Sequence, residues 1–430
     1  EKNEKISIDI NYKNYQKILN TRRESLKLFR ATENIHKWVP ANLNYKNQKY
    51  KIKIKLKGVH EEHWKHPNKW SFKIKIEDKK NIDGMKRFSV QHPRTRDYMY
   101  EWLMMKVLAE EGLISHRNRY LEIIINGNSL GNYYLEEVYS KQLIENNSRR
   151  EGPIIGFDKD LWIKEVNNLN NLSVNTIEDS FWRAKIKPIQ FKENSIGTEM
   201  ELYLNQAIQL MEDFRNKKIG PEEAFDVNQM ARLMAIKTII PSSEFDWRDV
   251  KFYFNPITRK LEPIGREIHI SKNNWWFYKL SNPELINDST YFINLFLDNQ
   301  DFYKLFLIEL NRLADHNYIK NIINKNKKEF DTNSKLLKRS YPLAEVFSEE
   351  MLESNRIKIL ETLNPLQGIN SYFINYLDNK KLILNLQNIQ KLPVIIKGIK
   401  FKNETSISLK KPIFITGKIN SEFAKSKIIE

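Results

Sequence analysis

The sequence predicts an α+β fold with two lobes and a small β-rich appendage at its C-terminal end. Three observations support this prediction. Alternating stretches typical of strands gather in the first third, helical periodicity dominates the middle, and short alternating stretches return from Leu392. We expect an N-terminal strand and helix extension over 1–37, a small lobe with a hinge over 38–158, a large, mainly helical lobe over 159–387, and the appendage over 388–430.

The predicted elements of the N-terminal third are strands interrupted by helices. Gln48–Lys57 alternates strictly between lysine and mostly apolar residues, and Gly58 ends this strand. Asp97–Gly112 carries apolar residues on one helical face and stops at a glycine. The other predicted elements are a strand at Ile6–Ile10, a basic helix around Tyr15–Phe29, a strand at Trp70–Ile76, a hairpin of Tyr120–Ile125 and Gly131–Val138, and a helix from Tyr139.

Helices dominate the prediction beyond residue 160, apart from one hairpin. In that hairpin Val250–Phe254 and Leu261–Ile264 flank a turn that contains Asn255 and Pro256. The predicted helices are Thr198–Arg215, Asp226–Ile240, Asp288–Ala314, Tyr318–Leu336 and Ser348–Leu363.

Composition limits the possible classes of protein. A net charge of +17 indicates an acidic partner or a polyanion, although Lys, Asn and Ile are frequent along the whole chain. The absence of cysteine excludes disulfides, thiolate metal sites and cysteine nucleophiles, and fits an exported bacterial protein or a cytosolic one. We expect no transmembrane helix, because no apolar run is long enough. A start at Glu1, without Met, is compatible with a removed signal peptide.

The hairpin carries acidic side chains at both of its open ends. Glu244, Asp246 and Asp249 precede the first strand, and Glu267 follows the second. Carboxylates gathered in this way repel one another unless a cation lies between them. Hard oxygen ligands of this kind suit Mg²⁺ or Mn²⁺ beside a phosphate. Solvated acids on a surface hairpin are the alternative.

The order of the elements up to residue 140 matches the small lobe of a protein kinase, and the acidic hairpin matches the kinase metal site. In this interpretation the loop from Gly58 to Pro67 covers a nucleotide. Lys75, or failing that Lys73, binds the α and β phosphates, and Glu101 on the helix holds that lysine. Ordinary solvent-facing strand lysines are the alternative. Glu136, at the end of the return strand beside the hinge, completes the nucleotide-binding residues that we predict.

Two further groups of residues have competing interpretations. His60, His63 and His66 have a spacing that zinc accepts, but no acid or cysteine pattern supports a metal site, which favours a loop over a ligand. Trp275 and Trp276 are candidates for stacking on a base or substrate, and burial in the large lobe is the favoured alternative.

Eight segments carry a recognisable pattern in a fixed order. They are Lys55–Gly58 (KLKG), Lys69–Lys75 (KWSFKIK), Gly84–Pro93 (GMKRFSVQHP), Glu101–Leu103 (EWL), Ile125–Gly127 (ING), Gly131–Glu137 (GNYYLEE), Arg149–Ile154 (RREGPI) and Phe252–Pro256 (FYFNP). Together they resemble the CotH family, the spore-coat-protein-H-like atypical kinases, from about Trp38 to about Leu313. The resemblance implies a divergent kinase-like fold, ATP with a divalent metal, and phosphoryl transfer to Ser or Thr of an acceptor protein. It implies that Asp246 is the catalytic base and that Asp249 and Glu267 are the metal ligands.

Four positions depart from the family pattern. Asp249 stands where Asn is usual, and Glu267 stands where Asp is usual. Arg266 replaces an aromatic residue before that acid, and Gly156 replaces a lysine before Phe157. A longer acid shifts its carboxylate by about a bond length, which matters for in-line transfer. We therefore expect nucleotide binding together with weakened catalysis.

Two classes of function follow from the sequence. The first is an ATP-dependent protein kinase or its catalytically dead relative, and the second is a non-enzymatic basic protein that binds an acidic or surface partner. The sequence favours an exported, cell-surface or spore-associated bacterial protein, with a cytoplasmic location as the alternative. Nucleic acid is not an expected partner.

Overall fold

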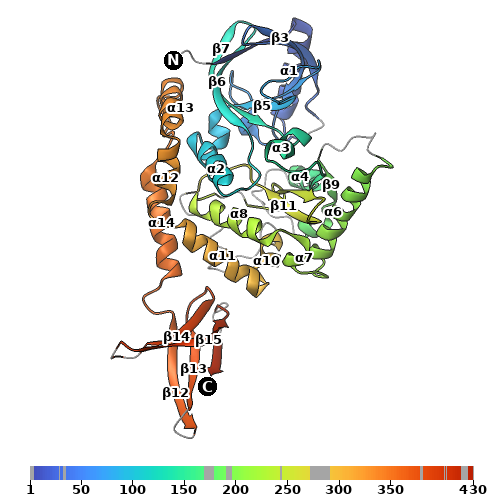
Figure 1. Ribbon diagram of the computed structural model, residues 1–430. Coiled ribbons are helices and arrows are strands. Elements are labelled where there is room, and N and C mark those ends of the chain that lie inside the picture. The colour runs from blue at the N-terminus through green and yellow to red at the C-terminus, as the bar shows by residue number, and fades with distance from the viewer. Residues whose placement is uncertain are drawn as a thin grey trace.

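The computed structural model has a barrel at one end, helices around a small sheet in the middle, and separate strands at the C-terminal end (Figure 1). This mixed content confirms the α+β class. The residues that the structure describes are 4–28, 30–31, 35–168, 179–189, 196–242, 245–271, 291–377, 381–400, 402, 404–417 and 425–429.

Seven strands close into a barrel in the order β1-β2-β3-β4-β5-β7-β6. Along β3 and β4 the apolar residues point into the barrel core and the lysines between them point outward. A one-residue slip would reverse both faces, so this pattern fixes the register. The strands are β1 (Lys5–Asp9), β2 (Val39–Tyr45), β3 (Gln48–Leu56), β4 (Phe72–Ile76), β5 (Arg87–Gln91), β6 (Asn118–Ile125) and β7 (Asn128–Glu137).

Three barrel strands differ from the sequence prediction. β1 was expected in an extension but lies between β2 and β6, where Ile6 pairs in parallel with Ile123. Pairing between two strands so far apart in the sequence cannot be recognised from any local sequence pattern. β2 was not predicted, because it contains Pro40 and two asparagines, which are depleted in strands. β5 was also missed, since only two of its five residues, Phe88 and Val90, are apolar.

Helices and short turns connect the barrel to the rest of the molecule. The predicted Asp97–Gly112 helix is confirmed as α2, whose apolar side chains are buried against the large core cluster. These elements are α1 (Tyr12–Ser25), the 3₁₀ turns η1 (Glu61–His63) and η2 (Pro93–Arg96), α2 (Met99–Glu110) and α3 (Lys141–Asn146).

A four-stranded sheet in the order β11-β10-β8-β9 lies beneath the barrel, among helices. It contains the predicted hairpin, now β10 (Lys251–Asn255) and β11 (Lys260–Ile264), in antiparallel register. The other elements of this part are β8 (Ile154–Phe157), α4 (Asp160–Asn168), α5 (Ser180–Arg183), β9 (Ile186–Pro188), α6 (Glu199–Arg215), α7 (Pro221–Ala224), α8 (Val227–Ile239), α10 (Tyr291–Leu297) and α11 (Gln300–Leu313).

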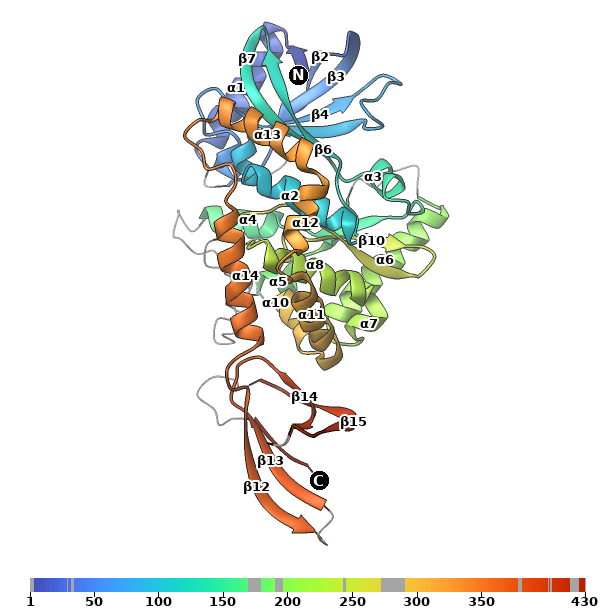
Figure 2. The same ribbon diagram turned by 60° about the vertical axis from the view of Figure 1, so that its left-hand side comes forward.

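Three helices, α12 (Tyr318–Lys325), α13 (Lys327–Ser340) and α14 (Glu349–Leu363), run along one side of the molecule (Figure 2). α13 is attached to the barrel, because Asn132 of β7 donates to Ser340 Oγ at 2.7 Å and its carbonyl accepts from Tyr341 at 2.7 Å. α14 is attached to α8, because the Asn355 amide donates to the carbonyls of Thr238 and Ile239, both at 2.9 Å. These helices therefore link the barrel to the helical part.

The C-terminal strands form two small sheets beyond α14. The sequence placed the change to β structure at residue 388, but β12 already begins at Ile369. A register shift between Phe373 and Asn375 interrupts the alternation of β12, which hides it from a search for strict period two. The strands are β12 (Ile369–Leu377), β13 (Lys381–Asn388), β14 (Val394–Lys400), β15 (Ser406–Ile415) and β16 (Lys425–Ile429).

Candidate active site

A cavity of about 390 Å³ lies where barrel strands face the small sheet and α4. Strands β3, β4 and β5 contribute to one wall, and the segments flanking the β10–β11 hairpin contribute Asp249 and Glu267 opposite. Most charged side chains in its lining are basic, which suits a polyanion such as a nucleoside triphosphate. The lining cations are Lys55, Lys57, Lys73, Arg87, Arg96, Lys159, Lys187, Arg248, Lys251 and Arg266, and the lining acids are Glu62, Asp160, Asp249 and Glu267.

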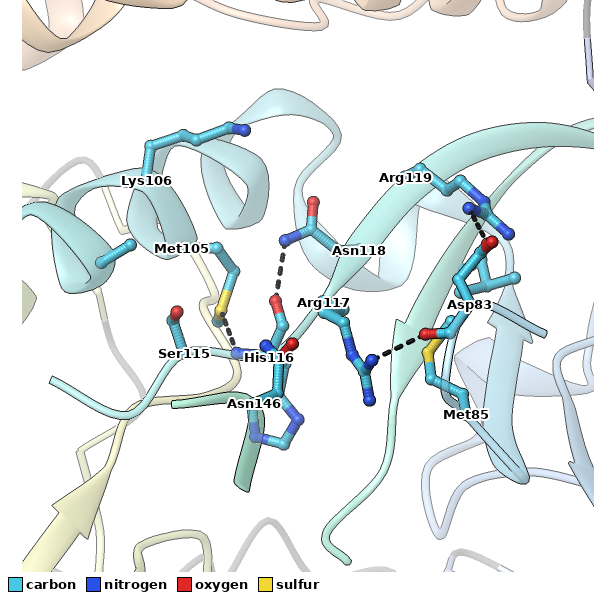
Figure 3. A pocket seen from close by; sticks show the side chains of 12 residues that line it. Asp83, Met85, Met105, Lys106, Ser115, His116, Arg117, Asn118, Arg119 and Asn146 are labelled. Carbon is cyan, nitrogen blue, oxygen red and sulfur yellow. Dashed lines mark hydrogen bonds and ion pairs between the residues drawn. The ribbon is translucent and has the colours of Figure 1, made fainter. Parts of the chain in front are cut away.

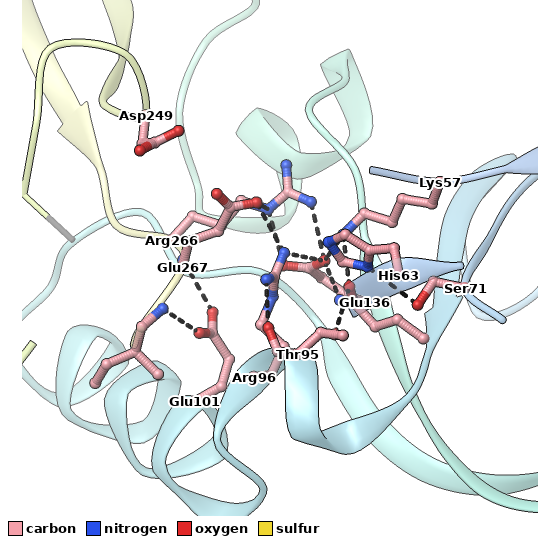
Figure 4. A network of polar contacts seen from close by, with 12 residues as sticks. Lys57, His63, Ser71, Thr95, Arg96, Glu101, Glu136, Asp249, Arg266 and Glu267 are labelled. Atoms are coloured by element: carbon pink, nitrogen blue, oxygen red, sulfur yellow. Dashed lines mark hydrogen bonds and ion pairs between the residues drawn. The ribbon is translucent and has the colours of Figure 1, made fainter. Parts of the chain in front are cut away.

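Glu136 is the centre of a buried ionic network beside this cavity (Figure 4). Arg266 donates two hydrogen bonds to its carboxylate, at 2.8 and 2.9 Å. Lys57 Nζ lies 3.3 Å from the same carboxylate, and Gln91 Nε2 donates to it at 2.6 Å. Burial works to raise the pKa of Glu136, but Arg266, Arg96 and Lys57 together hold it well below its ordinary value. Glu136 is therefore ionised at neutral pH.

Lys57 reaches this network because β3 ends one residue earlier. Gly58 has φ +92° and lies against the His63 ring, only 1.9 Å from where a Cβ would be, so the turn requires glycine. Lys57 Nζ also donates to Gln91 at 2.6 Å. Burial, with a contribution from the Arg96 charge, lowers the pKa of Lys57 to about 7. Lys57 is thus a buried amine that titrates near neutrality at the wall of the cavity.

Glu267 is held in place through its backbone as well as its side chain. Its φ is +60°, a left-handed conformation that is uncommon outside glycine. Its own N–H and that of Ile268 donate to Glu101 at 3.2 and 2.8 Å, and Lys237 donates to its carbonyl. Arg96 donates to the Glu267 carboxylate at 2.8 Å. Glu101 therefore positions the backbone of the predicted metal ligand.

The two aspartates before β10 each have a cationic partner. Asp249 Oδ1 lies 3.1 Å from Lys159 Nζ. Asp246 accepts from the backbone and the guanidinium of Arg248. Burial raises the pKa of Asp246, with Arg248 opposing the rise and Asp249 adding to it. Asp246 is therefore the more basic of the two aspartates, since the nearby cations lower the pKa of Asp249 despite its burial.

Gly156 lies beside a lysine of the neighbouring strand. Lys251 of β10 pairs with Gly156 of β8, and a Cβ built at Gly156 would lie 2.3 Å from Lys251 Cδ. Burial lowers the pKa of Lys251 to about 8. Lys251 thus places an amine beside Gly156 in the cavity lining, where it donates to the carbonyls of Arg248 and Val250.

The structure brings most of the predicted site residues together. Lys73, Asp249 and Glu267 line the cavity, whereas Asp246, Glu101 and Glu136 contact residues that line it. Lys75 does not line it, and its Nζ lies 2.9 Å from Glu77 on the outer face of the barrel. Glu244, Trp275 and Trp276 lie outside the described residues. The roles assigned to all these residues stay predictions.

The loop expected over the nucleotide contributes Gly58, Val59, His60, Glu62 and His63 to the cavity lining. His60 bonds to Arg30 and His63 to Ser71, so these two rings have protein partners. Within the described ranges no group of three or more His, Cys, Asp or Glu side chains has the geometry of a metal site.

The donor set nevertheless fits a divalent cation held jointly with a ligand. Asp249 and Glu267 supply hard carboxylate oxygens to one cavity. Mg²⁺ typically uses one or two carboxylates and completes its octahedron with phosphate oxygens and water. A metal here would displace Lys159 and Arg96 from the two carboxylates.

Sequence reasoning missed four cations of this site: Lys57, Arg96, Lys159 and Lys251. Lys57 had a local signal, because it stands between the alternating strand and Gly58. The other three depend on contacts between segments far apart in the chain: Arg96 with Glu267, Lys159 with Asp249, and Lys251 across Gly156.

A second cavity of about 360 Å³ lies between α2, the start of β6 and the loop before β5 (Figure 3). Its arginines are engaged with neighbouring groups: Arg117 pairs with Glu137 at 2.5 Å and donates to the Asp83 carbonyl at 2.6 Å, and Arg119 pairs with Asp83. The first cavity has many more cations in its lining and is therefore the stronger candidate for an anionic ligand.

Comparison with known proteins gives one clear result. Residues 54–332 match the family model described as CotH kinase protein. The matched region includes Lys57, Glu136 and the hairpin with its flanking acids. No curated protein matches the chain.

Proposed function

The chain belongs to the CotH kinase family, and on that premise we propose that it binds ATP with Mg²⁺ or Mn²⁺ and transfers phosphate to Ser or Thr of an acceptor protein. One observation carries the proposal: the two acids that flank a single hairpin line the same basic cavity as Lys57, which rests on buried Glu136. The proposal agrees with a divergent two-lobed kinase-like arrangement in which the barrel is the small lobe. Family membership also favours spore association. Within the described ranges, none of the helices is long and apolar enough to cross a bilayer.

In this proposal each group of cavity residues has its own role in phosphoryl transfer. Asp249 and Glu267 hold a divalent cation, which neutralises phosphate charge and orients the transferred group. Lys57 and Lys251 face the triphosphate, whereas Lys159 is the partner that the cation displaces from Asp249. Asp246 orients the acceptor hydroxyl and takes its proton. The positions of these charges matter, because donors stabilise a transition state only if they point to where its charge develops.

A Glu267→Ala variant tests the metal site. We expect it to lose most of the rise in thermal unfolding temperature that ATP produces with Mn²⁺, because only Asp249 remains as a protein carboxylate ligand. Lys159 makes a matched control: Lys159→Met should keep or enlarge the Mn²⁺ effect, since it frees Asp249. A full metal-dependent shift in Glu267→Ala would contradict the assignment.

Nucleotide binding should also take up protons. At pH 8 most Lys57 and about half of Lys251 are unprotonated, given pKa values of about 7 and about 8. An incoming polyphosphate favours their charged forms, so we expect an uptake of about one proton. Calorimetry of ATP binding at pH 8, in buffers of different ionisation enthalpy, measures this uptake. Lys57→Met should reduce it and the exposed Lys327→Met should not; binding heats independent of the buffer would refute the coupling.

A second function, binding without catalysis, is favoured by one specific observation. Both proposed metal ligands are paired with cations, Asp249 with Lys159 and Glu267 with Arg96. Incubation with γ-labelled ATP, Mg²⁺ or Mn²⁺ and a mixture of acceptor proteins separates the two functions. Metal-dependent ATP binding with no label incorporated under either metal would identify a pseudokinase.

A further inference from the structure

The outer face of the barrel beside the cavity carries an unusual register of charges. Across β3 and β4, Lys55 pairs with Lys73 and Lys53 pairs with Lys75, and across β4 and β5, Lys75 pairs with Arg87. Side chains directly opposite each other in an antiparallel pair lie on the same face, about 4.5–5.5 Å apart at Cβ. We call these five residues, Lys53, Lys55, Lys73, Lys75 and Arg87, the basic face.

Like charges in directly opposed positions destabilise a sheet. The basic face contains three such pairs in succession. Glu77 partly relieves the repulsion between Lys53 and Lys75, which it contacts at 3.1 and 2.9 Å. Lys55 lies over the Trp38 ring, with Nζ 5.2 Å from its centre. The repulsion between these cations destabilises the free protein, and a bound anion would relieve it.

The basic face is continuous with the candidate active site. Lys55, Lys73 and Arg87 line the cavity. Lys53 and Lys75 continue the same rows away from it, with side chains 44% and 36% exposed. The face therefore leads from solvent into the cavity of the candidate active site.

We propose that the basic face binds an acidic segment of the acceptor protein in extended conformation; this inference rests on the proposed kinase function and assigns a substrate class to it. Alternate residues of an extended chain are about 6.6–6.8 Å apart, which is also the spacing of Lys53 and Lys55 along β3. Acidic residues at alternate positions of the acceptor then meet successive lysines. The members of the face are all cations, whereas single-stranded nucleic acid sites also use aromatic platforms.

The test is fluorescence anisotropy of a labelled peptide in which one serine is followed by alternating glutamates, added to the full chain without ATP. The comparison peptide has glutamine for every glutamate. Lys53→Glu should weaken binding of the acidic peptide about 5- to 10-fold, because it reverses a charge on the face, and Glu77→Gln should strengthen it about 2- to 3-fold. Lys335→Glu on α13, which is exposed and changes the net charge equally, should leave binding unchanged.

The outcomes separate this inference from the proposed activity. Equal effects of Lys53→Glu and Lys335→Glu, equal binding of the two peptides, or tighter binding of a single-stranded RNA homopolymer would overturn the basic face as an acidic-acceptor site. Label transfer to both peptides alike, unchanged by Lys53→Glu, would also overturn it while supporting kinase activity. Acidic-peptide binding that follows the expected order, with no label incorporated into the acceptor mixture under either metal, would support the face and refute the activity.

Discussion

Asp246→Asn is expected to reduce phosphate transfer by about 10²- to 10⁴-fold, the usual contribution of a general base. Asparagine keeps the shape of the side chain but has no affinity for the proton of the acceptor hydroxyl. Asp246 suits the role because burial raises its pKa and because Arg248, its partner, lines the cavity. Label incorporation at saturating ATP measures the effect, and the metal-dependent thermal shift with ATP should persist.

Asp226→Asn is the matched control for this substitution. Asp226 caps α8 by accepting from the Gln229 N–H, and asparagine caps a helix equally well. Transfer by this control should equal that of the parent protein. Undiminished turnover of Asp246→Asn would remove Asp246 from the base role, and loss of ATP binding along with transfer would make it a structural or metal-binding residue instead.

Glu136→Gln is expected to lower the free energy of unfolding by about 3–5 kcal/mol, because it leaves buried cations without their counter-charge. Arg266, Lys57 and Arg96 all face this one carboxylate. Urea unfolding at pH 7 measures the loss. Because the pKa of Glu136 in the folded protein lies well below 4.5, its stabilisation is complete above about pH 4.5 and disappears only as the pH falls towards that folded pKa.

The adjacent Glu137 provides the control for burial. It is equally buried, but its partner Arg117 is 26% exposed and keeps access to water. Glu137→Gln should therefore cost clearly less than Glu136→Gln. A double variant, Glu136→Gln with Lys57→Met, should recover part of the loss, because it removes one of the stranded charges. Equal losses for the two single variants would show that the network around Glu136 has no special energetic role.

The elements with strong local periodicity could be predicted from the sequence, and the pairing of charges could not. The lysine alternation of β3 and the turn at Asn255 and Pro256 reveal a strand and a hairpin directly. Of the acids around that hairpin, Asp249 and Glu267 line the cavity and Asp246 contacts Arg248 in its lining. Lys75 was preferred as the phosphate lysine because every lysine on one face of a strand looks alike. Lys57 differs only in its position just after β3, where Gly58 turns the chain. There its amine contacts Glu136, which no local pattern reveals.

The role expected of Glu101 illustrates the same limit. The sequence suggested that it holds a lysine, whereas its carboxylate accepts from the backbone N–H groups of Glu267 and Ile268. No local pattern identifies a backbone segment far along the chain as the partner of a helix glutamate. Likewise the closure of the barrel by β1 depends on a parallel pairing with β6.

The attachment of α13 to β7 and of α14 to α8 limits how the protein can exchange its ligand. Separation of the barrel from the helical part as two rigid bodies would break the hydrogen bonds of Asn132 and Asn355, or bend the helices between them. In the proposed kinase we therefore expect ligand entry and product release to depend on local displacement of the segment from Gly58 to His63, which contributes to the cavity lining, rather than on wide separation of the two parts. The rate of product release should then be limited by this local displacement.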